Sequence, residues 1–366
     1  MVKNKHLTAS LFFIVGALIL SGILILSSVS SAYSFKKFGN TYYFLKHQII
    51  FGLIPGIIMG FLAFKTKLSL LKKWSPGLLL ITLVLMLMVF LPFMSFKSGD
   101  AARWIKIGIF TFQPSELLKL VSILYFATWL SSRMEREEKS LEKTFMAFLM
   151  LLIIIILLLY FQSNVSTLGV IVLTAFLMYF SIDTPLWHIL LVILLGIGAL
   201  FVLIKVAPYR INRLAVFLNP DLDPMGIGYQ VKQAIITVGS GGTWGVGLGM
   251  SAQKFGFLPQ TISDSIFAVF SEETGFIGAI FLILLFLFFA WTGFKIAKRS
   301  KDSFSKLTAL GITFWIIIQA FVNIGAMIGV LPLTGIPLPF IGYGGSALAL
   351  ELVGIGILLN ISKNAT

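Results

Sequence analysis

Three carboxylates lie close together in the stretch 239–273, in a chain that has only 14 Asp and Glu among 366 residues. Asp264, Glu272 and Glu273 follow a glycine-rich run and stand at the head of an apolar segment. A carboxylate in such a place can serve as a general base. The predicted helix places Asp264 in its first turn, where the helix dipole stabilises negative charge. The alternative is that Asp264 only caps this helix.

The glycine-rich run before these acids contains Gly247, Gly249 and Ala252, which match the pattern G-x-G-x-x-A. They follow no strand of a βαβ unit, and no GxxxxGK[ST] motif occurs, so nucleotide binding is excluded. Glycine instead provides backbone that adopts positive φ and approaches a ligand closely. Gln253 and Lys254 follow as polar side chains able to bind that ligand.

Positive side chains that could bind an anion occur near two further motifs. Arg103 precedes Trp104, and a guanidinium suits bidentate contact with phosphate. The alternative is an arginine that anchors an aromatic belt at the membrane surface. Glu116 and Lys119 are three residues apart, on one face of a predicted helix. Charges inside a span are often functional, but this pair could also simply pin two helices together.

The composition is that of a polytopic membrane protein. Hydrophobic residues make up 58% of the chain and charged residues 11%, and the mean hydropathy is +1.00. The absence of cysteine excludes disulfides and thiolate chemistry. The net charge of +14 does not indicate nucleic-acid binding, because basic and aromatic residues are not interleaved in a soluble module. The first apolar run is interpreted as a retained span rather than a cleaved signal.

A helix needs roughly 20 apolar residues to cross a bilayer, and the sequence offers about ten such runs. They are predicted near residues 8–30, 46–64, 75–95, 114–132, 144–161, 164–181, 186–206, 264–294, 306–330 and 343–361. The expected fold is therefore all-α, as one integral membrane domain over residues 1–366. An even number of spans places both termini on one side of the membrane.

Lys and Arg are more frequent in the short segments on the side of the termini, which predicts that both termini are cytoplasmic. The opposite side has a long loop at 207–263, between the seventh and eighth predicted helices. Loops of this length are usually functional or disordered, and this one is apolar and glycine-rich. The working face is therefore predicted to be extracytoplasmic, where Arg210, Lys232 and Lys254 could also neutralise an anionic ligand.

Several motifs together resemble the SEDS family, which contains the FtsW and RodA proteins. The resemblance spans nearly the whole chain, and its form is closer to FtsW than to RodA. The matching segments, in chain order, read ARWIKIG, QPSELLKL, GYQVKQAIITVGSGGTWGVGLGMSAQKFGFLP, DSIFAVFSEETGFIG and QAFVNIGAMIGVLPLTGIPLPFIGYGGS.

The resemblance implies that Asp264 is the catalytic residue and that Arg103, Glu116 and Lys119 occupy positions conserved in the family. Three motifs depart from the usual pattern: Ile262 replaces a histidine, Asn164 replaces an aspartate, and Ala347 replaces the final serine of Gly-Gly-Ser-Ser. These departures could mean a divergent member with altered substrate or activity.

The implied reaction is inverting glycosyl transfer between lipid II and a growing glycan on undecaprenyl pyrophosphate, in cell division. Asp264 takes the proton of the acceptor hydroxyl, while positive charge stabilises the leaving pyrophosphate. The candidate substrate-binding and pyrophosphate-binding residues are Arg103, Glu116, Lys119, Arg210, Lys232, Gln253, Lys254 and Ser346. No residue cluster has metal-ligand spacing, so a divalent cation (Mg²⁺ or Mn²⁺) would be recruited with the pyrophosphate.

The resemblance also implies a bacterial cytoplasmic membrane location. The expected partners are lipid II, a class B penicillin-binding transpeptidase, and other membrane proteins of the divisome or elongasome. Two alternatives remain for the function. A lipid II translocase would use the same basic outer cavity without a base, and a scaffold for a transpeptidase would have weakened catalysis.

Overall fold

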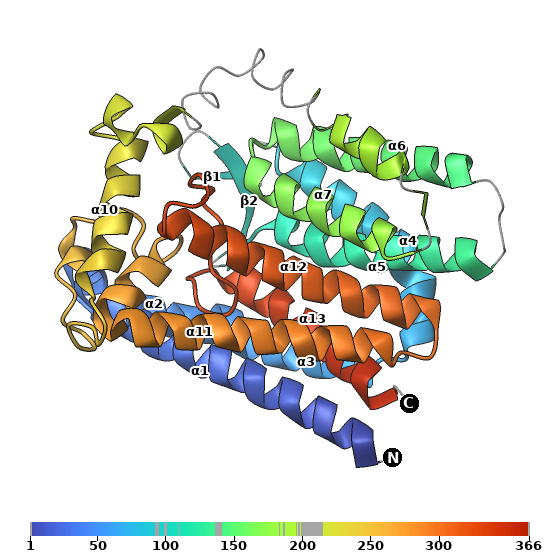
Figure 1. Cartoon of the computed structure of the whole chain (residues 1–366), viewed down its shortest axis with the longest axis horizontal. Coiled ribbons are helices and arrows are strands. Elements are labelled where there is room, and N and C mark those ends of the chain that lie inside the picture. The colour runs from blue at the N-terminus through green and yellow to red at the C-terminus, as the bar shows by residue number, and fades with distance from the viewer. Residues whose placement is uncertain are drawn as a thin grey trace.

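The computed structural model shows long helices that run side by side along one axis (Figure 1). It describes residues 2–91, 95–98, 101–108, 110–135, 141–182, 184–185, 187–194, 196, 198 and 215–364. Within these residues, six helices are long and apolar enough to cross a membrane, and two shorter apolar helices span Phe145–Phe161 and Val165–Phe180. The mainly helical, multi-span fold is confirmed, whereas the count of about ten spans stays a prediction.

The helices before the long outer loop agree closely with the predicted runs. A π-helical turn, η1 (Ile49–Leu53), joins α2 to α3 into one span. The predicted run at 186–206 is helical over residues 187–194, and most of its remainder lies outside the described residues. The bounds are α1 (Val2–Phe38), α2 (Tyr43–Gln48), α3 (Ile54–Lys65), α4 (Leu68–Met88), α5 (Pro114–Glu135), α6 (Leu141–Phe161) and α7 (Val165–Phe180).

Three long helices follow the outer loop: α11 (Ile266–Lys298), α12 (Ser303–Met327) and α13 (Gly345–Asn364). Helix α12 lies against α5, α7 and α11, and is buried along most of its length. Helix α13 lies along α3, where small residues allow close approach. A Cβ on Gly356 of α13 would lie 2.0 Å from the carbonyl oxygen of Gly60 on α3.

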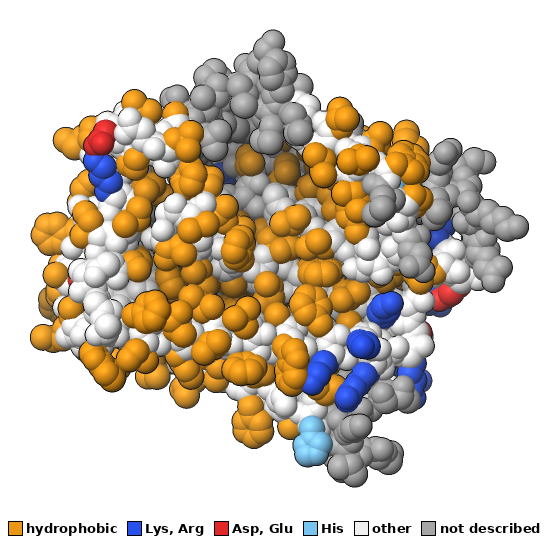
Figure 2. Space-filling view, viewed as in Figure 1, with side chains coloured by type: hydrophobic (Ala, Val, Ile, Leu, Met, Phe, Trp, Pro, Cys, Tyr) orange, Lys and Arg blue, Asp and Glu red, His pale blue; other side chains and the backbone are white. Residues whose placement is uncertain are grey.

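The two termini lie at the same end of the bundle (Figure 1). The hydroxyl groups of Thr8 on α1 and Ser362 on α13 are hydrogen-bonded at 2.7 Å. Figure 2 shows Lys and Arg side chains gathered at this end, while hydrophobic side chains cover most of the visible face. The two termini therefore lie at the same end of the bundle, and their position on the cytoplasmic side of the membrane stays a prediction from the charge distribution.

The opposite end corrects the expectation of a purely helical chain. A three-stranded antiparallel sheet is formed by β1 (Ser95–Ser98), β2 (Ala101–Ile107) and β3 (Phe110–Phe112). Phe96 pairs with Trp104, and Ile105 pairs with Phe112. The sequence favours a strand locally, because Trp104, Ile105 and Ile107 are aromatic or β-branched, and buried Ile105 is followed by exposed Lys106.

The long outer loop is also more regular than predicted. It contains α10 (Ile227–Ser240) and two short 3₁₀ turns, η2 (Pro220–Leu222) and η3 (Gln253–Phe255). Helix α10 buries Gly228, Val231, Ala234 and Thr237, which recur every three residues and so form one face. This face lies against α11 and α12, so α10 covers the outer end of the helices that carry the predicted site.

Candidate active site

Asp264 lies just before α11 rather than in its first turn. The helix begins at Ile266, and Ser265 occupies the N-cap, so the predicted start at residue 264 was two residues too early. Asp264 is half-buried, and this burial raises the pKa of its carboxyl to about 6, against an opposing hydrogen bond from the Ser263 side chain. At pH 7 most of the carboxyl is therefore ionised and able to accept a proton.

A side chain from α12 fixes the backbone on both sides of the carboxylate. Asn323 Nδ2 donates to the carbonyl oxygen of Asp264 at 2.8 Å and to that of Ile336 at 2.7 Å. A Cβ on Gly335 would lie 3.4 Å from Asp264 Oδ2, and Gly335 has a φ of +72°. A side chain there would be strained by the positive φ, and its Cβ would touch the carboxylate. Asn323 thus joins Asp264 to the segment before α13.

The turn 340–345 holds the other side of Asp264. The Tyr343 amide donates to the carbonyl oxygen of Ile262 at 2.9 Å. Gln48 then spans the turn: its Nε2 donates to the Gly342 oxygen at 3.3 Å, and its Oε1 accepts from the Gly344 amide at 3.0 Å. The Tyr343 hydroxyl is hydrogen-bonded to His47 Nδ1 at 2.9 Å. Helix α2 therefore fixes the turn in place.

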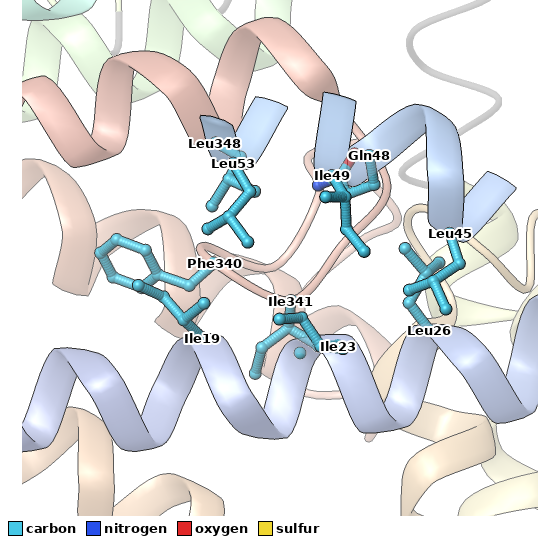
Figure 3. Close-up of a pocket in the computed structure, with 11 residues that line it drawn as sticks. Ile19, Ile23, Leu26, Leu45, Gln48, Ile49, Leu53, Phe340, Ile341 and Leu348 are labelled. Atoms are coloured by element: carbon cyan, nitrogen blue, oxygen red, sulfur yellow. The ribbon is translucent and has the colours of Figure 1, made fainter. Parts of the chain in front are cut away.

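Apolar side chains anchor the same turn from below. Figure 3 shows Phe340 and Ile341 between Ile19 and Ile23 of α1 and the side chains of α2, η1 and α13. The cavity among these side chains has a volume of about 10 Å³, which is room for about one water molecule. The turn is therefore packed on its inner side, and this hollow has no room for a polyprenyl tail.

The predicted ion pair between Glu116 and Lys119 is present and buried. Lys119 Nζ lies 2.8 Å from Glu116 Oε2, and both side chains are at most 6% exposed. Lys119 Nζ also donates to Gln319 Oε1 at 2.9 Å and lies 5.3 Å from the centre of the Trp315 ring. Through Lys119 the pair thus connects α5 to α12. Holding two helices together is one of the two roles expected of this pair from the sequence.

This buried network continues to the segment beside Asp264. Gln319 Nε2 donates to the Pro337 oxygen at 3.1 Å and to Glu351 Oε1 at 3.4 Å. Glu351 Oε2 accepts from the Phe340 amide at 2.8 Å. Gln319 and Asn323, one helical turn apart on α12, therefore hold residues 336–340 from one side. Their spacing of four residues places both side chains on one face of α12, which suits contact between helices.

A second buried network holds the outer loop on α11. Lys254 Nζ lies 3.0 Å from Glu273 Oε1 and donates to the Gly249 oxygen at 2.6 Å. Ser28 of α1 donates to both carboxylate oxygens of Glu273, at 2.8 and 2.7 Å. Glu272 accepts a hydrogen bond from Ser251. Both glutamates therefore have hydrogen-bond partners, which a carboxylate inside a membrane span requires.

Part of the glycine-rich run packs closely against the backbone of α11, and its approach to a ligand stays a prediction. Helix α11 is broken at Gly275, where φ is +71°. The Val246 and Gly247 amides donate to the carbonyl oxygens of Glu272 and Glu273, both at 3.0 Å. A Cβ on Gly245 would lie 2.3 Å from the Glu273 oxygen. The close approach predicted for glycine is thus made to the backbone of α11.

Arg103 of β2 contacts the corner between α6 and α7. Its Nε donates to the Gln162 oxygen at 3.3 Å, and a terminal nitrogen donates to the Ser163 oxygen at 2.6 Å. Three residues further along, Ser166 of α7 donates to the Thr334 oxygen. Because Gly335 lies against Asp264, a short chain of contacts connects Arg103 to the carboxylate.

Ser346, predicted to bind substrate, lies at the start of α13 beside the sheet. Its Oγ accepts from the Gln113 amide at 3.3 Å and donates to the Thr111 oxygen at 3.4 Å. Ser115 Oγ accepts from Gln113 Nε2 and from Asn164 Nδ2, each at 3.0 Å. Asn164, which replaces an aspartate of the family pattern, also caps α7. This substitution therefore retains a polar contact to α5.

The remaining predicted ligands are spread over the outer loop. Lys232 of α10 forms an exposed pair with Asp221. Gln253 lies half-buried in η3, and Arg210 lies outside the described residues. Lys119, Lys232 and Lys254 are each paired with a carboxylate of the protein. Among the described residues, no three His, Cys, Asp or Glu side chains meet in a way that could hold a metal ion.

Sequence reasoning missed two contributors to the site. Gln48 is a polar residue inside an apolar run, which is a signal of interhelical contact. Gly335, between Thr334 and Ile336, carries no such signal, because its role depends on a positive φ beside Asp264.

Comparisons with known proteins agree with the motifs. The model of the cell cycle protein family of FtsW, RodA and SpoVE matches residues 8–366. The chain is 37% identical over 364 residues to stage V sporulation protein E of Bacillus subtilis (strain 168), covering 99% of each protein. It is 35% identical over 341 residues to the probable peptidoglycan glycosyltransferase FtsW of Geobacter sp. (strain M18), covering 93% and 92%. Several further relatives are also named FtsW, in agreement with the predicted FtsW-type form.

Solved structures share the fold. One is a chain of a peptidoglycan synthase complex that coordinates polymerization and crosslinking. It superposes with a TM-score of 0.80 at 26% identity, covering 96% of both chains. The rod shape determining protein RodA of Thermus thermophilus superposes with a TM-score of 0.72 at 24% identity, covering 97% of this chain and 96% of that chain. The motifs, the family match and the shared fold all lead to one conclusion: this multi-pass membrane protein belongs to the FtsW, RodA and SpoVE family.

Proposed function

We propose that the protein is a peptidoglycan glycosyltransferase that polymerises lipid II into glycan strands on the outer face of the bacterial cytoplasmic membrane, in cell division. The observation that carries the proposal is the setting of Asp264. Its carboxyl is half-buried, has a pKa of about 6, and is held by Asn323 at the end of the bundle opposite the termini. The FtsW relatives bear the name of this activity.

In this reaction a sugar hydroxyl of lipid II attacks C1 of the growing glycan. The new glycosidic C–O bond forms as the bond from C1 to the pyrophosphate oxygen breaks, which inverts C1 to give a β-1,4 link. Asp264 accepts the proton of the attacking hydroxyl, and the lipid-linked pyrophosphate leaves with the bonding electron pair. A pKa of about 6 suits this role, because the base is ionised at pH 7 and its conjugate acid is strong enough to release the proton.

The departing pyrophosphate needs positive charge and hydrogen-bond donors. We assign this role to Arg103, whose contacts with the α6–α7 corner lead to the segment beside Asp264. Lys232, whose pair with Asp221 is exposed, would contribute by exchanging its carboxylate partner for phosphate oxygens, whereas Lys254 would first have to break its buried pair with Glu273. Gln253, Arg210 and Ser346 are the further candidate ligands.

Glu116 and Lys119 support the site from inside the bundle in this proposal. Their pair lies behind Gln319, which holds the Pro337 oxygen, so they fix the segment that faces Asp264. For Lys119 to reach a phosphate, its buried pairing with Glu116 would have to open, and breaking a buried pair costs several kcal/mol, about 3–5.

A divalent cation, if required, would enter with the pyrophosphate. Asp264 and the neighbouring 335–345 segment offer one carboxylate, which is fewer oxygen ligands than Mg²⁺ or Mn²⁺ needs without phosphate. The protein should then bind Mg²⁺ or Mn²⁺ only when the pyrophosphate substrate is present. Removal of the cation with EDTA should leave the unfolding temperature of the protein alone unchanged.

A class B penicillin-binding transpeptidase is the proposed partner, together with other membrane proteins of the divisome. The support is the fold shared with a chain of a peptidoglycan synthase complex that coordinates polymerization and crosslinking. A partner that crosslinks the product would need the glycan to emerge on the outer face, where Asp264 is proposed to act.

The proposal is tested with purified protein and labelled lipid II, assayed with and without a class B transpeptidase. The expected result is glycan product in at least one condition, lost on Asp264→Ala. Movement of lipid II across vesicle membranes without product, unaffected by Asp264→Ala, would identify a translocase instead. Absence of product in both conditions, with the transpeptidase still bound, would identify a scaffold.

A further inference from the structure

A basic hollow lies at the end of the bundle opposite Asp264. Its volume is about 420 Å³, within the range of about 300–1,000 Å³ typical of ligand pockets. It is formed where α3 turns into α4 and where α13 ends. The described residues that line it include no acid, and they are Phe64, Lys65, Thr66, Lys67, Leu68, Ser69, Asn360, Lys363 and Asn364.

Hydrogen bonds fix the shape of this basic hollow. Asn360 is 5% exposed, and its Nδ2 donates to the carbonyl oxygens of Ala63 at 3.1 Å and Thr66 at 2.6 Å. These bonds satisfy carbonyl groups at the end of α3, which would otherwise repel an anion. Asn364 Nδ2 donates in turn to the backbone and side-chain oxygens of Asn360, at 3.1 and 3.0 Å. The wall is therefore preformed.

Two features make the basic hollow attractive to an anion. Lys65 at the end of α3, Lys67 at the start of α4 and Lys363 at the end of α13 contribute three positive charges. Helix α4 begins at Leu68 with no side-chain cap on its first amides, and Lys67 occupies the N-cap. The positive end of this 21-residue helix thus faces the same space.

The surroundings of the basic hollow distinguish a lipid headgroup from a free anion. Helix α3 exposes Ile57, Ile58, Phe61 and Leu62 along the stretch that leads to the hollow, and α4 exposes Trp74 near its start. In a membrane span these side chains face acyl chains, and tryptophan marks the headgroup level. A ligand that fills the hollow can therefore extend an apolar tail along α3.

We propose that this basic hollow binds the phosphate headgroup of an anionic phospholipid at the membrane surface on the side of the two termini. The three lysines and the α4 amides hold the phosphate, and the exposed side chains of α3 hold the acyl chains. Basic pockets between transmembrane helices are suited to such headgroups. This assignment is independent of the glycosyltransferase site at the other end of the bundle.

The test compares two variants of the full-length protein with the same change of net charge. One is Lys65→Gln/Lys67→Gln/Lys363→Gln. The matched control, at the exposed turn between α11 and α12 on the same side, is Lys298→Gln/Lys301→Gln/Lys306→Gln. Each is reconstituted in nanodiscs of equal parts phosphatidylglycerol and phosphatidylcholine. Native mass spectrometry then counts the phosphatidylglycerol that stays bound after transfer to detergent.

Wild type and control should retain phosphatidylglycerol over phosphatidylcholine, and the hollow variant should retain at least about tenfold less. Retention by wild type should fall as NaCl is raised. Equal losses in the two triple variants would overturn the proposal, because surface charge alone would explain binding. Complete displacement of the lipid by about 10 mM inorganic phosphate would also overturn it, since a lipid held through its tails should stay.

A single substitution separates loss of binding from loss of folding. Lys67→Glu places a negative charge at the N-terminus of α4, which stabilises the helix dipole but repels a phosphate. The unfolding temperature should therefore be maintained while phosphatidylglycerol retention falls by at least about fivefold. Retention at the wild-type level in this folded variant would contradict the proposal.

Discussion

Asp264 carries an energetic cost that follows from its burial. Its folded pKa, about 6, is higher than its usual value of 3.8, so protonation stabilises the folded state. This contribution is fully present below pH 3.8 and is lost as the pH rises through 6. At neutral pH the ionised carboxylate therefore destabilises the fold by at most about 3 kcal/mol.

The first prediction concerns stability. Asp264→Asn removes this charge while keeping the shape of the side chain, so the unfolding temperature at pH 7.5 should equal or exceed that of wild type. The difference should shrink as the pH falls through about 6, because wild type then becomes neutral at this position too. Thermal unfolding in detergent at pH 7.5 and pH 5 measures both values. A clear loss of stability at pH 7.5 would show that the carboxylate is a structural contact.

The second prediction concerns the rate. If Asp264 is the base, kcat/KM for lipid II should fall about tenfold per pH unit below pH 6, the pKa raised by burial. Polymerisation rates between pH 5 and 8 measure this limb, with the unfolding temperature followed at each pH. A rate that is constant from pH 7.5 to pH 5 would argue against Asp264 as the proton acceptor.

Among the helices and loops, the site depends on the hydrogen bonds by which α12 holds the 336–340 segment. Asn323→Ala leaves the Asp264 and Ile336 carbonyl oxygens without their donor, which should cost about 1–3 kcal/mol. Because it also frees the backbone of Asp264, it should lower kcat and shift the acid limb of the pH profile. Thermal unfolding and pH-dependent rates measure the two effects.

Asn360→Ala is the matched control for Asn323→Ala. Asn360 likewise donates to two carbonyl oxygens, those of Ala63 and Thr66, but at the other end of the bundle. The Asn360→Ala variant should lose a similar amount of stability, and the acid limb of its pH–rate profile should match that of wild type. Identical shifts of the limb in both variants would show that Asn323 acts through overall stability and does not position Asp264.

The buried pair of α5 gives a third test at this scale. Lys119→Ala leaves the Glu116 carboxylate buried without its cation and should destabilise the protein by about 3–5 kcal/mol. Lys36→Ala, at the exposed end of α1, should unfold like wild type. Thermal unfolding and polymerisation are compared in the two variants. Equal behaviour would mean that the network from Glu116 to Glu351 does not hold the 337–340 segment.

For the whole molecule, the contact between α3 and α13 connects the two ends of the bundle. The hollow lies at one end of these helices, and Glu351 and the 340–345 turn lie toward the other. Gly356→Ala places a Cβ against the Gly60 oxygen and should cost about 1–3 kcal/mol. Gly169→Ala, a helical position in α7 with open space around its Cβ, should not be destabilising. Thermal unfolding compares the two variants. Equal unfolding temperatures would show that α3 and α13 do not depend on close contact at Gly356.

The long apolar runs made most of this architecture predictable, because the length of a span and its hydropathy are local properties. The sheet at Ser95–Phe112 was missed because short strands between spans leave only a weak alternating pattern. The role proposed for Asp264 comes from its sequence motif and stays a prediction. The placement of Asn323, Gly335 and Gln48 around it could not be predicted, since the hydrogen bonds of Asn323 and Gln48 join residues 13 and 296 positions apart.

The basic side chains show the limit of reasoning from charge alone. Their types predict anion binding, but Lys119 and Lys254 satisfy buried glutamates in the folded chain. Which carboxylate a lysine meets depends on how distant helices pack, and spacing reveals this only for a pair such as Glu116 and Lys119 on one helix.

The central claim is that Asp264 is the base of lipid II polymerisation, and the most direct measurement is glycan product formed by purified Asp264→Asn. Asp221→Asn is the matched control, since Asp221 is an acid of the same outer region that is largely exposed. We predict that Asp264→Asn forms no detectable glycan while keeping the unfolding temperature of wild type, and that Asp221→Asn polymerises at nearly the wild-type rate. Polymerisation by folded Asp264→Asn at a rate near that of wild type would contradict the account.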